Sequence, residues 1–297
     1  MNQVLRLLNA TPFEVRRFQG PPQHREQLSR LKVVHLTDLH FGRVTPIEVQ
    51  REAVEIANGE KPDLVVITGD FVCHSHRYLD ALIAELSRLN APTIGVLGNH
   101  DYWSGEKEVI WALKKAGVEV LRNQWTEMRV RGEKVQVVGL DDAYTGHGDV
   151  EQAVKGLRKH IASIGLSHIA EEADALWEKG VPLVLSGHTH GGQITVARLN
   201  EIALGRIFGH RYIHGLYGSG ANARRSKGSV YVNAGVGAAI IPLRIGEKGR
   251  REVVVFELGA EPTVIHKHHG EQEAYPTRLH HNRYLRYRPI RISKKRA

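Results

Sequence analysis

The sequence predicts an α/β fold in which two packed sheets form one domain. Apolar β-branched runs alternate with helical patterns through the first third of the chain, which is typical of a mainly parallel sheet. Several strand-like runs then follow one another after residue 117, which indicates a second sheet. Polar residues that can bind metals come directly after many of these runs. Together these observations favour a catalytic α/β domain.

The first hundred residues contain three predicted strands. LKVVHLTD (31–38), DLVVITGD (63–70) and PTIGVLGN (92–99) are short apolar runs that end in a polar residue. Between them, residues 45–58 and 76–89 place apolar side chains at helical spacing, and Pro46 suits a first helical turn. The alternation predicts strands joined by helical crossovers, and therefore parallel neighbours in one sheet.

The second part of the domain begins after a helical stretch at 105–117. VEVLRN, TEMRVRG and KVQVVGLDD follow as consecutive strands, with turn signals at Asn123 and at Gly132. Helical segments near 149–159 and 169–180 precede the strand VPLVLSG, and runs at 228–235 and 250–258 close the sheet region. We expect an N-terminal extension over 1–30, the domain over 31–258 and a tail over 259–297.

The composition is that of an ordinary globular protein. Of 297 residues, 41% are hydrophobic and 25% charged, which is enough to build a sizeable core. No run approaches the roughly eighteen apolar residues of a membrane helix, and the N-terminal apolar segment, interrupted by Arg6, is too short for a signal peptide. The single cysteine, Cys73, excludes an internal disulfide and a cysteine-rich zinc site, and it fits a cytoplasmic setting.

The net charge of +9 is concentrated in the tail. Residues 274–297 carry eight lysines and arginines and no acidic side chain, so the rest of the chain has a net charge of only +1. A nearly neutral body argues against nucleic acid as a partner. The tail, with Tyr275, Tyr284 and Tyr287, is suited to an anionic membrane surface. A solvated, disordered tail and an RNA-binding tail are the alternatives.

Ligand-type residues gather after the predicted strands. In open α/β sheets, active sites form beyond the carboxyl ends of the strands. One aspartate there is usually a cap or a turn former, but five groups of carboxylates, imidazoles and an amide are hard to explain by capping. The groups are Asp38 with His40; Asp70; Asn99 with His100 and Asp101; His168; and His188 with His190.

These ligand types suit divalent Mn, Fe, Zn or Co better than an ion that seeks thiolates. An aspartate can bridge two cations, so one site of this composition can hold two metals about 3.5–4 Å apart. Such a pair activates water and holds phosphoryl oxygens during in-line displacement. Glycines before Asp70, Asn99 and His188 allow the backbone to turn sharply and to approach a ligand closely.

The motifs over residues 38–192 resemble, in kind and in order, those of the calcineurin-like metallophosphoesterases. They are D-x-H, G-D, G-N-H-D, S-H and G-H-T-H-G-G. The resemblance implies a four-layer α/β/β/α sandwich of two mixed sheets flanked by helices. It also implies that His100 protonates the leaving oxygen or stabilises the transition state, oriented by Asp101. One implied metal site comprises Asp38, His40, Asp70 and His190; the other comprises Asp70, Asn99, His168 and His188.

A narrower resemblance is to the bacterial branch of YkuE- and YaeI-like proteins, through GHTHGGQI and the segment around SVYVNAGVGAAIIPLRIG. This branch usually begins with a membrane-anchoring helix, which has no counterpart here. Its fourth motif usually reads S-H-x-P, whereas this chain has LSHIAEE. His160 is therefore the alternative to His168, although the spacing of twenty residues to His188 favours His168.

The substrate is left open by the sequence. Relatives in this branch include enzymes that split the pyrophosphate of UDP-diacylglucosamine, which implies a phosphodiester or pyrophosphate with a lipid-linked or nucleotide portion. A phosphomonoesterase, a nuclease and a non-catalytic scaffold on the same fold are the alternatives; a scaffold would have lost ligands, and here every ligand position is filled.

Four further residues lie close to the motifs in the sequence. Arg43 is a candidate for binding a substrate phosphate. We expect His74 and His76 to lie in a solvated loop and Cys73 to pack under the following helix.

Overall fold

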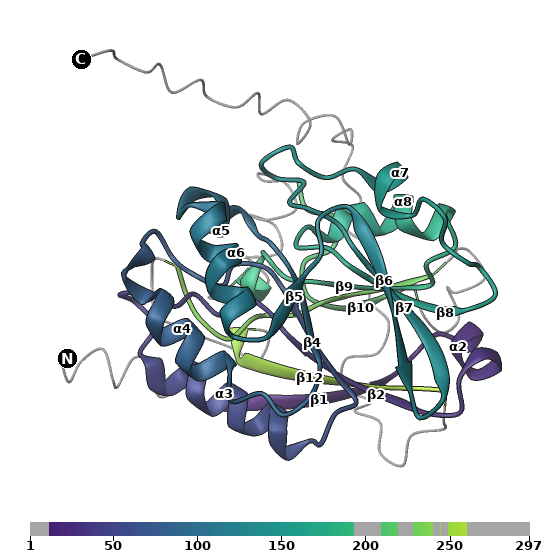
Figure 1. Ribbon diagram of the computed structural model, residues 1–297, viewed down its shortest axis with the longest axis horizontal. Coiled ribbons are helices and arrows are strands. Elements are labelled where there is room, and N and C mark those ends of the chain that lie inside the picture. Colours follow the sequence, from purple (N-terminus) through teal and green to yellow (C-terminus); the bar gives the residue numbers. More distant parts are fainter. Residues whose placement is uncertain (1–11, 193–208, 219–227, 240–243, 245–248, 260–297) are drawn as a thin grey trace.

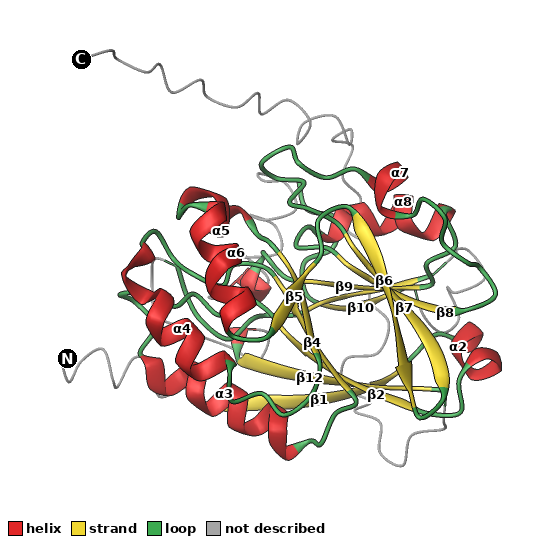
Figure 2. Cartoon of the chain, in the orientation of Figure 1, coloured by secondary structure: helices red, strands yellow, loops and turns green. Residues whose placement is uncertain are grey.

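Two six-stranded sheets pack face to face, and helices cover the outer face of each (Figure 1). This arrangement is seen in a computed structural model that describes residues 12–192, 209–218, 228–239, 244 and 249–259. The layers follow the order helix, sheet, sheet, helix, as Figure 2 shows by colour. The expected four-layer α/β/β/α fold is confirmed.

The first sheet has the strand order β1-β12-β2-β3-β4-β5. Strands β2 to β5 are parallel neighbours, whereas β12 pairs antiparallel with β2 and parallel with β1. The strands are β1 (Phe13–Gln19), β2 (Leu31–Leu36), β3 (Leu64–Thr68), β4 (Thr93–Val96), β5 (Val118–Val120) and β12 (Arg251–Leu258).

The second sheet has the order β10-β11-β9-β8-β7-β6. Its centre, from β11 to β7, is parallel, and its two outer pairs are antiparallel. Both sheets are therefore mixed. The strands are β6 (Gln124–Val130), β7 (Glu133–Gly139), β8 (Ala162–Leu166), β9 (Leu183–Ser186), β10 (Gly215–Tyr217) and β11 (Ser229–Val232).

The central strands are apolar throughout because both of their faces are buried. In β2, Leu31 and Val33 point into the core between the sheets, while Val34 and Leu36 point into the core under the helices. Successive side chains of a strand alternate between its faces, so one short run serves both cores. This explains why the predicted strands show continuous hydrophobicity.

The helices divide between the two outer layers. Residues of α3, α4 and α6 pack on the first sheet, and residues of α7, η2 and α8 pack on the second. The helices are α2 (Pro22–Gln27), α3 (Ile47–Gly59), η1 (His76–Tyr78), α4 (Leu79–Leu86), α5 (Asn99–Trp103), α6 (Glu106–Lys115), α7 (Val150–Ala153), η2 (Ala170–Glu172), α8 (Ala173–Glu178) and η3 (His190–Gly192).

The structure differs from the expected N-terminal extension over 1–30. Residues 13–19 form β1, which pairs with β12 along its whole length, and α2 contacts β8, where His24 Nε2 lies 3.0 Å from the Ser163 carbonyl oxygen. Strand β1 was missed because FEVRRFQ carries two arginines. One of them, Arg16, is buried beside Glu252 of β12, so the pair brings charge into the sheet.

Four further elements were not predicted: α5, β8, β10 and η3. The helix expected near 149–159 is limited to α7, and the one near 169–180 is divided between η2 and α8. No helix among the described residues is long and apolar enough to cross a membrane. The basic tail lies outside the described residues.

Candidate metal centre

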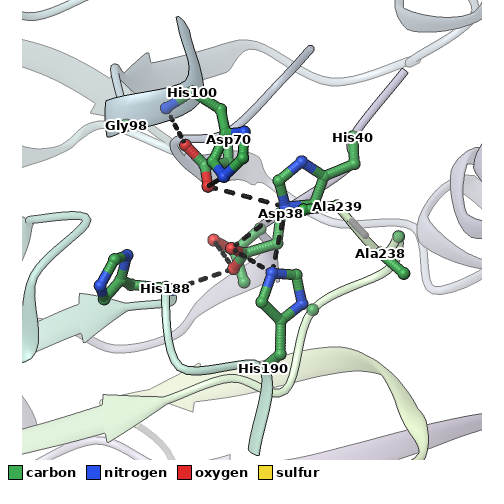
Figure 3. A network of polar contacts seen from close by, with 12 residues as sticks. Asp38, His40, Asp70, Gly98, His100, His188, His190, Ala238 and Ala239 are labelled. Carbon is green, nitrogen blue, oxygen red and sulfur yellow. Dashed lines mark hydrogen bonds and ion pairs between the residues drawn. The ribbon is translucent and has the colours of Figure 1, made fainter. Parts of the chain in front are cut away.

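The seven expected ligands converge where five strands end. Asp38 and His40 follow β2, Asp70 follows β3 and Asn99 follows β4. His168 follows β8 in the second sheet, and His188 and His190 follow β9. The site therefore spans both sheets, and Figure 3 shows several of its side chains pointing toward one another.

Asp38, His40 and His190 form the first half of the cluster. The Nε2 atoms of His40 and His190 lie 3.0 Å apart, and Asp38 Oδ1 lies 3.3 Å from His190 Nε2 and 3.9 Å from His40 Nε2. The other Asp38 oxygen accepts hydrogen bonds from the Thr37 hydroxyl and from the His188 backbone N–H. One carboxylate oxygen and two imidazole nitrogens therefore face a common point, as metal ligands do.

Asp70 joins this half to the second one. Its Oδ2 lies 3.6 Å from His40 Nε2 and 3.4 Å from His168 Nε2. His168 Nδ1 donates to the Thr68 carbonyl oxygen at 2.7 Å, which leaves its Nε2 lone pair for the site. His188 Nδ1 lies 3.2 Å from that same Nε2. Asp70 is therefore placed between the two groups of imidazoles.

The cluster contains buried polar atoms that the protein itself leaves unpartnered. Asn99 Oδ1 and Asp38 Oδ1 have no hydrogen-bond donor, although both atoms are buried. A buried acceptor without a partner is costly unless something else satisfies it. Carboxylate, amide and imidazole donors suit a divalent cation of the first transition series. The residues present therefore fit divalent metal ions.

The backbone of the cluster is held in an unusual conformation. Asp38, His40, Asp70, His188 and His190 all have positive φ, between 46° and 72°. A residue other than glycine rarely adopts such angles, and they concentrate at functional sites. A Cβ on Gly187 would overlap the Thr37 hydroxyl and the Asp38 carboxylate, so only glycine fits there. The expected close approach of the backbone is confirmed at this position.

The electrostatics of the cluster favour a bound cation. Burial opposes ionisation of Asp70, but His168, His40 and His100 hold the pKa of its carboxyl well below the ordinary range. Burial likewise opposes protonation of His168, yet the charges of Asp70, Asp38 and Asp142 raise its pKa to about 10. The aspartates therefore draw a proton onto a buried imidazole, and a metal ion in the cluster would supply that positive charge instead.

His100 lies at the edge of the cluster. Its backbone N–H donates to Asp70 Oδ1 at 2.9 Å, and its Nε2 lies 4.0 Å from Asp70 Oδ2. The expected role of Asp101 requires correction: its carboxylate does not orient His100 but accepts hydrogen bonds from the backbone N–H groups of Val72 and Gly98. Asp101 therefore holds the two loops together.

The other candidates lie in different places. His168 follows β8 and lies in the cluster. His160 precedes β8, at the other end of that strand, and is exposed. Arg43 is exposed on the turn after His40. Cys73 is buried, and its Sγ approaches His74 and His100. His74 is exposed, as expected, but contacts His100.

The sequence does not predict the aromatic side chains that lie beside the cluster. The Trp103 ring lies 4.8 Å from the His100 ring and 6.0 Å from that of Tyr144, which lies 5.4 Å from His188. Trp103 is 54% exposed. Its only sequence signal is its position three residues after His100, at the end of α5.

The fold and the cluster together define a metal-dependent hydrolase. Residues 31–192 match the family described as calcineurin-like phosphoesterase, and the chain belongs to this family. It is 33% identical to the uncharacterised metallophosphoesterase YkuE of Bacillus subtilis over 233 residues, 76% of this chain and 78% of that protein. It is 29% identical to phosphodiesterase YaeI of Escherichia coli over 240 residues, 79% of this chain and 84% of that protein.

Membership makes the chain a metal-dependent phosphoric ester hydrolase and implies divalent metal ions as cofactors. The expected resemblance to the YkuE and YaeI branch is confirmed.

Proposed function

We propose that this chain uses two divalent metal ions to hydrolyse a phosphodiester or pyrophosphate bond. The observation that carries this proposal is the position of Asp70 Oδ2 between His40 and His168, with unpartnered acceptor atoms on both sides. One ion is assigned to Asp38, His40, Asp70 and His190, and the other to Asp70, Asn99, His168 and His188. When bound, such ions act as Lewis acids toward water and phosphoryl oxygens.

His100 and Arg43 are the residues that we assign to direct contact with the substrate. His100 lies beside Asp70 but is assigned to neither of the two ions, so its Nε2 is available to a substrate oxygen. Donation of a proton from Nε2 to the leaving oxygen is the role that we assign to it. Arg43, exposed on the neighbouring turn, is the proposed contact for a substrate phosphate.

Trp103 and Tyr144 support a substrate that carries an organic group beside the phosphorus. An exposed tryptophan beside a polar cluster offers a flat apolar surface that inorganic phosphate cannot use. The name phosphodiesterase, given to the relative YaeI, agrees with such a substrate. A lipid-linked or nucleotide pyrophosphate similar to UDP-diacylglucosamine belongs to this class. Phosphomonoesterase and nuclease activities are the competing functions.

A screen with added Mn²⁺, Zn²⁺, Fe²⁺ or Co²⁺ tests this proposal. We expect bis(p-nitrophenyl) phosphate or a pyrophosphate diester to be hydrolysed with a higher kcat/KM than p-nitrophenyl phosphate. A preference for the monoester would overturn the proposed substrate class. The absence of metal-dependent hydrolysis of every ester would favour a non-catalytic scaffold.

The role of Trp103 has a matched control in Trp111, which is also 54% exposed. We expect Trp103→Ala to lower kcat/KM for an aryl or nucleotide diester by about threefold to tenfold, the range for losing one aromatic contact. Trp111→Ala, on α6, should leave this value unchanged. Equal effects of the two substitutions would contradict a substrate surface at Trp103.

The basic tail is proposed to hold the enzyme at the cytoplasmic face of an anionic membrane. Eight cationic side chains without an acidic one each contribute up to about 1 kcal/mol near such a surface, and less in salt. Deletion of residues 275–297 should abolish salt-sensitive flotation with anionic vesicles and preserve hydrolysis of a small substrate. Failure of the full chain to float with such vesicles at low salt would refute this anchor.

A further inference from the structure

A cluster of three further ligand atoms lies on the Nδ1 side of His100. His100 Nδ1 lies 3.1 Å from His74 Nδ1, and Cys73 Sγ lies 3.3 Å from His74 Nδ1 and 3.9 Å from His100 Nδ1. None of these three atoms belongs to the ligand set assigned above. Cys73 is the only cysteine of the chain.

The three distances match the edges of a tetrahedral zinc site. With Zn–N bonds of about 2.0–2.1 Å and Zn–S bonds of about 2.3 Å, tetrahedral angles place two nitrogens about 3.3 Å apart and a nitrogen and a sulfur about 3.6 Å apart. Each measured distance differs from its ideal edge by about 0.3 Å or less. One cation can therefore reach all three atoms with little movement of the side chains.

The fold holds these atoms in place and leaves access from solvent. The Cys73 backbone N–H donates to the Phe41 carbonyl oxygen, which fixes the loop after β3 against the turn after β2. His74 has a φ of 58°, the same rare conformation as the ligands of the main cluster. Cys73 is buried, whereas His74 is exposed, so a cation from solution can enter from the His74 side.

The charge nearby favours a cation as well. The Asp70 carboxylate lies 4.0 Å from the other nitrogen of the His100 ring. His40 adds a ligand atom within 4.8 Å of those of Cys73 and His100, on the inner side of the cluster.

Burial, and then the charge of Asp70, raise the pKa of the Cys73 thiol to about 11, so a metal must displace a proton to bind the sulfur.

We propose that Cys73, His74 and His100 form a third metal site, selective for Zn²⁺ or a similarly soft divalent ion, with its fourth position open to solvent. A thiolate and two imidazoles favour such ions over Mn²⁺ and Mg²⁺, which prefer oxygen ligands. The site is therefore chemically distinct from the oxygen-rich cluster of Asp38, Asp70 and Asn99.

Occupation of this site would inhibit hydrolysis, a consequence that rests on the proposed function of His100. An imidazolium ion has protons on both nitrogens and readily donates one. A metal on Nδ1 displaces the proton there and leaves a single proton on Nε2, whose loss would create an imidazolate. The metal-bound neutral imidazole is a far weaker acid than an imidazolium ion, so the leaving oxygen would no longer be protonated efficiently.

Binding can be tested without any turnover. Protein loaded with Mn²⁺ is titrated with Co²⁺, and the near-ultraviolet absorption band of a thiolate–cobalt bond is recorded. Because Cys73 is the only cysteine, we expect this band in the wild type and none in Cys73→Ser, which keeps a donor toward the Ala239 carbonyl oxygen. His74→Ala should weaken binding at least tenfold, and His76→Ala, a change to the exposed histidine nearby, should not weaken it.

Inhibition is tested with micromolar Zn²⁺ on the Mn²⁺-loaded enzyme, each variant being compared with its own uninhibited rate. The wild type and His76→Ala should lose activity, whereas Cys73→Ser and His74→Ala should resist. A wild type without the thiolate–cobalt band, or a band that persists in Cys73→Ser, overturns the site. A normal band without zinc inhibition supports the site and overturns its effect on His100. An enzyme that hydrolyses no ester but shows the band contradicts only the proposed function.

Discussion

Two buried polar clusters in this molecule differ in how their charges are satisfied. In the first, the Glu252 cluster, both carboxylate oxygens have partners. Glu252 Oε1 lies 2.7 Å from Arg16 Nε and 2.6 Å from His214 Nε2, and Oε2 accepts from the Tyr231 hydroxyl and the Ala234 N–H. In the metal-binding cluster, Asp38 Oδ1 and Asn99 Oδ1 have no donor.

The backbone shows the same contrast. No residue of the Glu252 cluster has positive φ, whereas five ligands of the metal-binding cluster do. Burial and charge alone therefore do not distinguish a structural ion network from a metal site. Unpartnered acceptor atoms on a strained backbone do distinguish the metal site. A cation is needed to satisfy these atoms, and tertiary structure must hold the strained residues in place.

Among the substitutions that test this contrast between the two clusters, that of Asp70 should have the largest effect. Asp70→Asn removes the charge between the two groups of imidazoles, so we expect metal loss and no measurable turnover. Added Mn²⁺ should raise the Tm of the wild type, because a ligand that binds the native state stabilises it, but not that of the variant. Full activity of the variant after chelation of trace metal would contradict the two-metal assignment.

His100→Ala separates catalysis from metal binding within the same cluster. We expect kcat to fall by about 10²–10⁴, the range for a general acid, with an unchanged metal content. Kinetics and elemental analysis of one preparation measure both quantities. Loss of either of the two ions assigned to the main cluster would instead make His100 one of that cluster's ligands.

Glu252→Gln should affect stability and leave the metal content unchanged. Removing one charge from a buried ion pair leaves Arg16 paired with the partly exposed Glu14, so we expect the free energy of unfolding to fall by about 3 kcal/mol. Glu257→Gln on the same strand is the control, because its contacts to Arg30 and Lys32 are 3.8 and 3.9 Å long and should contribute less than about 1 kcal/mol. Urea denaturation measures both variants.

The pH dependence of stability gives the smallest expected effect. Burial opposes ionisation of Glu252, but His214, Arg16 and the Ala234 N–H lower its pKa to about 2. A lowered carboxyl pKa contributes stability above the unfolded-state value of 4.5, and this stability is lost as the pH falls toward 2. Between pH 6 and 3, the wild type should lose about 2 kcal/mol more than Glu252→Gln. Parallel losses would show that Glu252 is not stabilised as an anion.

Most ligand positions could be predicted because they follow a predicted strand, whereas β8, which precedes His168, was not predicted. An apolar run fixes the strand, and the next polar residues then share one edge of the sheet with those of neighbouring strands. Asp38, Asp70 and His188 were all identified in this way.

The features that were missed depend on contacts between distant segments. Asp101 was expected to orient the neighbouring His100, but its partners include Val72, which follows another strand. Cys73 was treated as a core residue because nothing local predicts that it approaches His100. Strand β1 was missed because the pairing of Arg16 with Glu252, which are more than two hundred positions apart, makes its polar sequence compatible with burial.

The position of β12 between β1 and β2 has a consequence for biosynthesis. The ribosome synthesises β1 and β2 early. Strand β12, which lies between them, is synthesised after all the other described strands of both sheets. Until it emerges, the exposed edge of β2 can pair with a strand of another polypeptide. The first sheet can therefore be completed only after β12 has been synthesised.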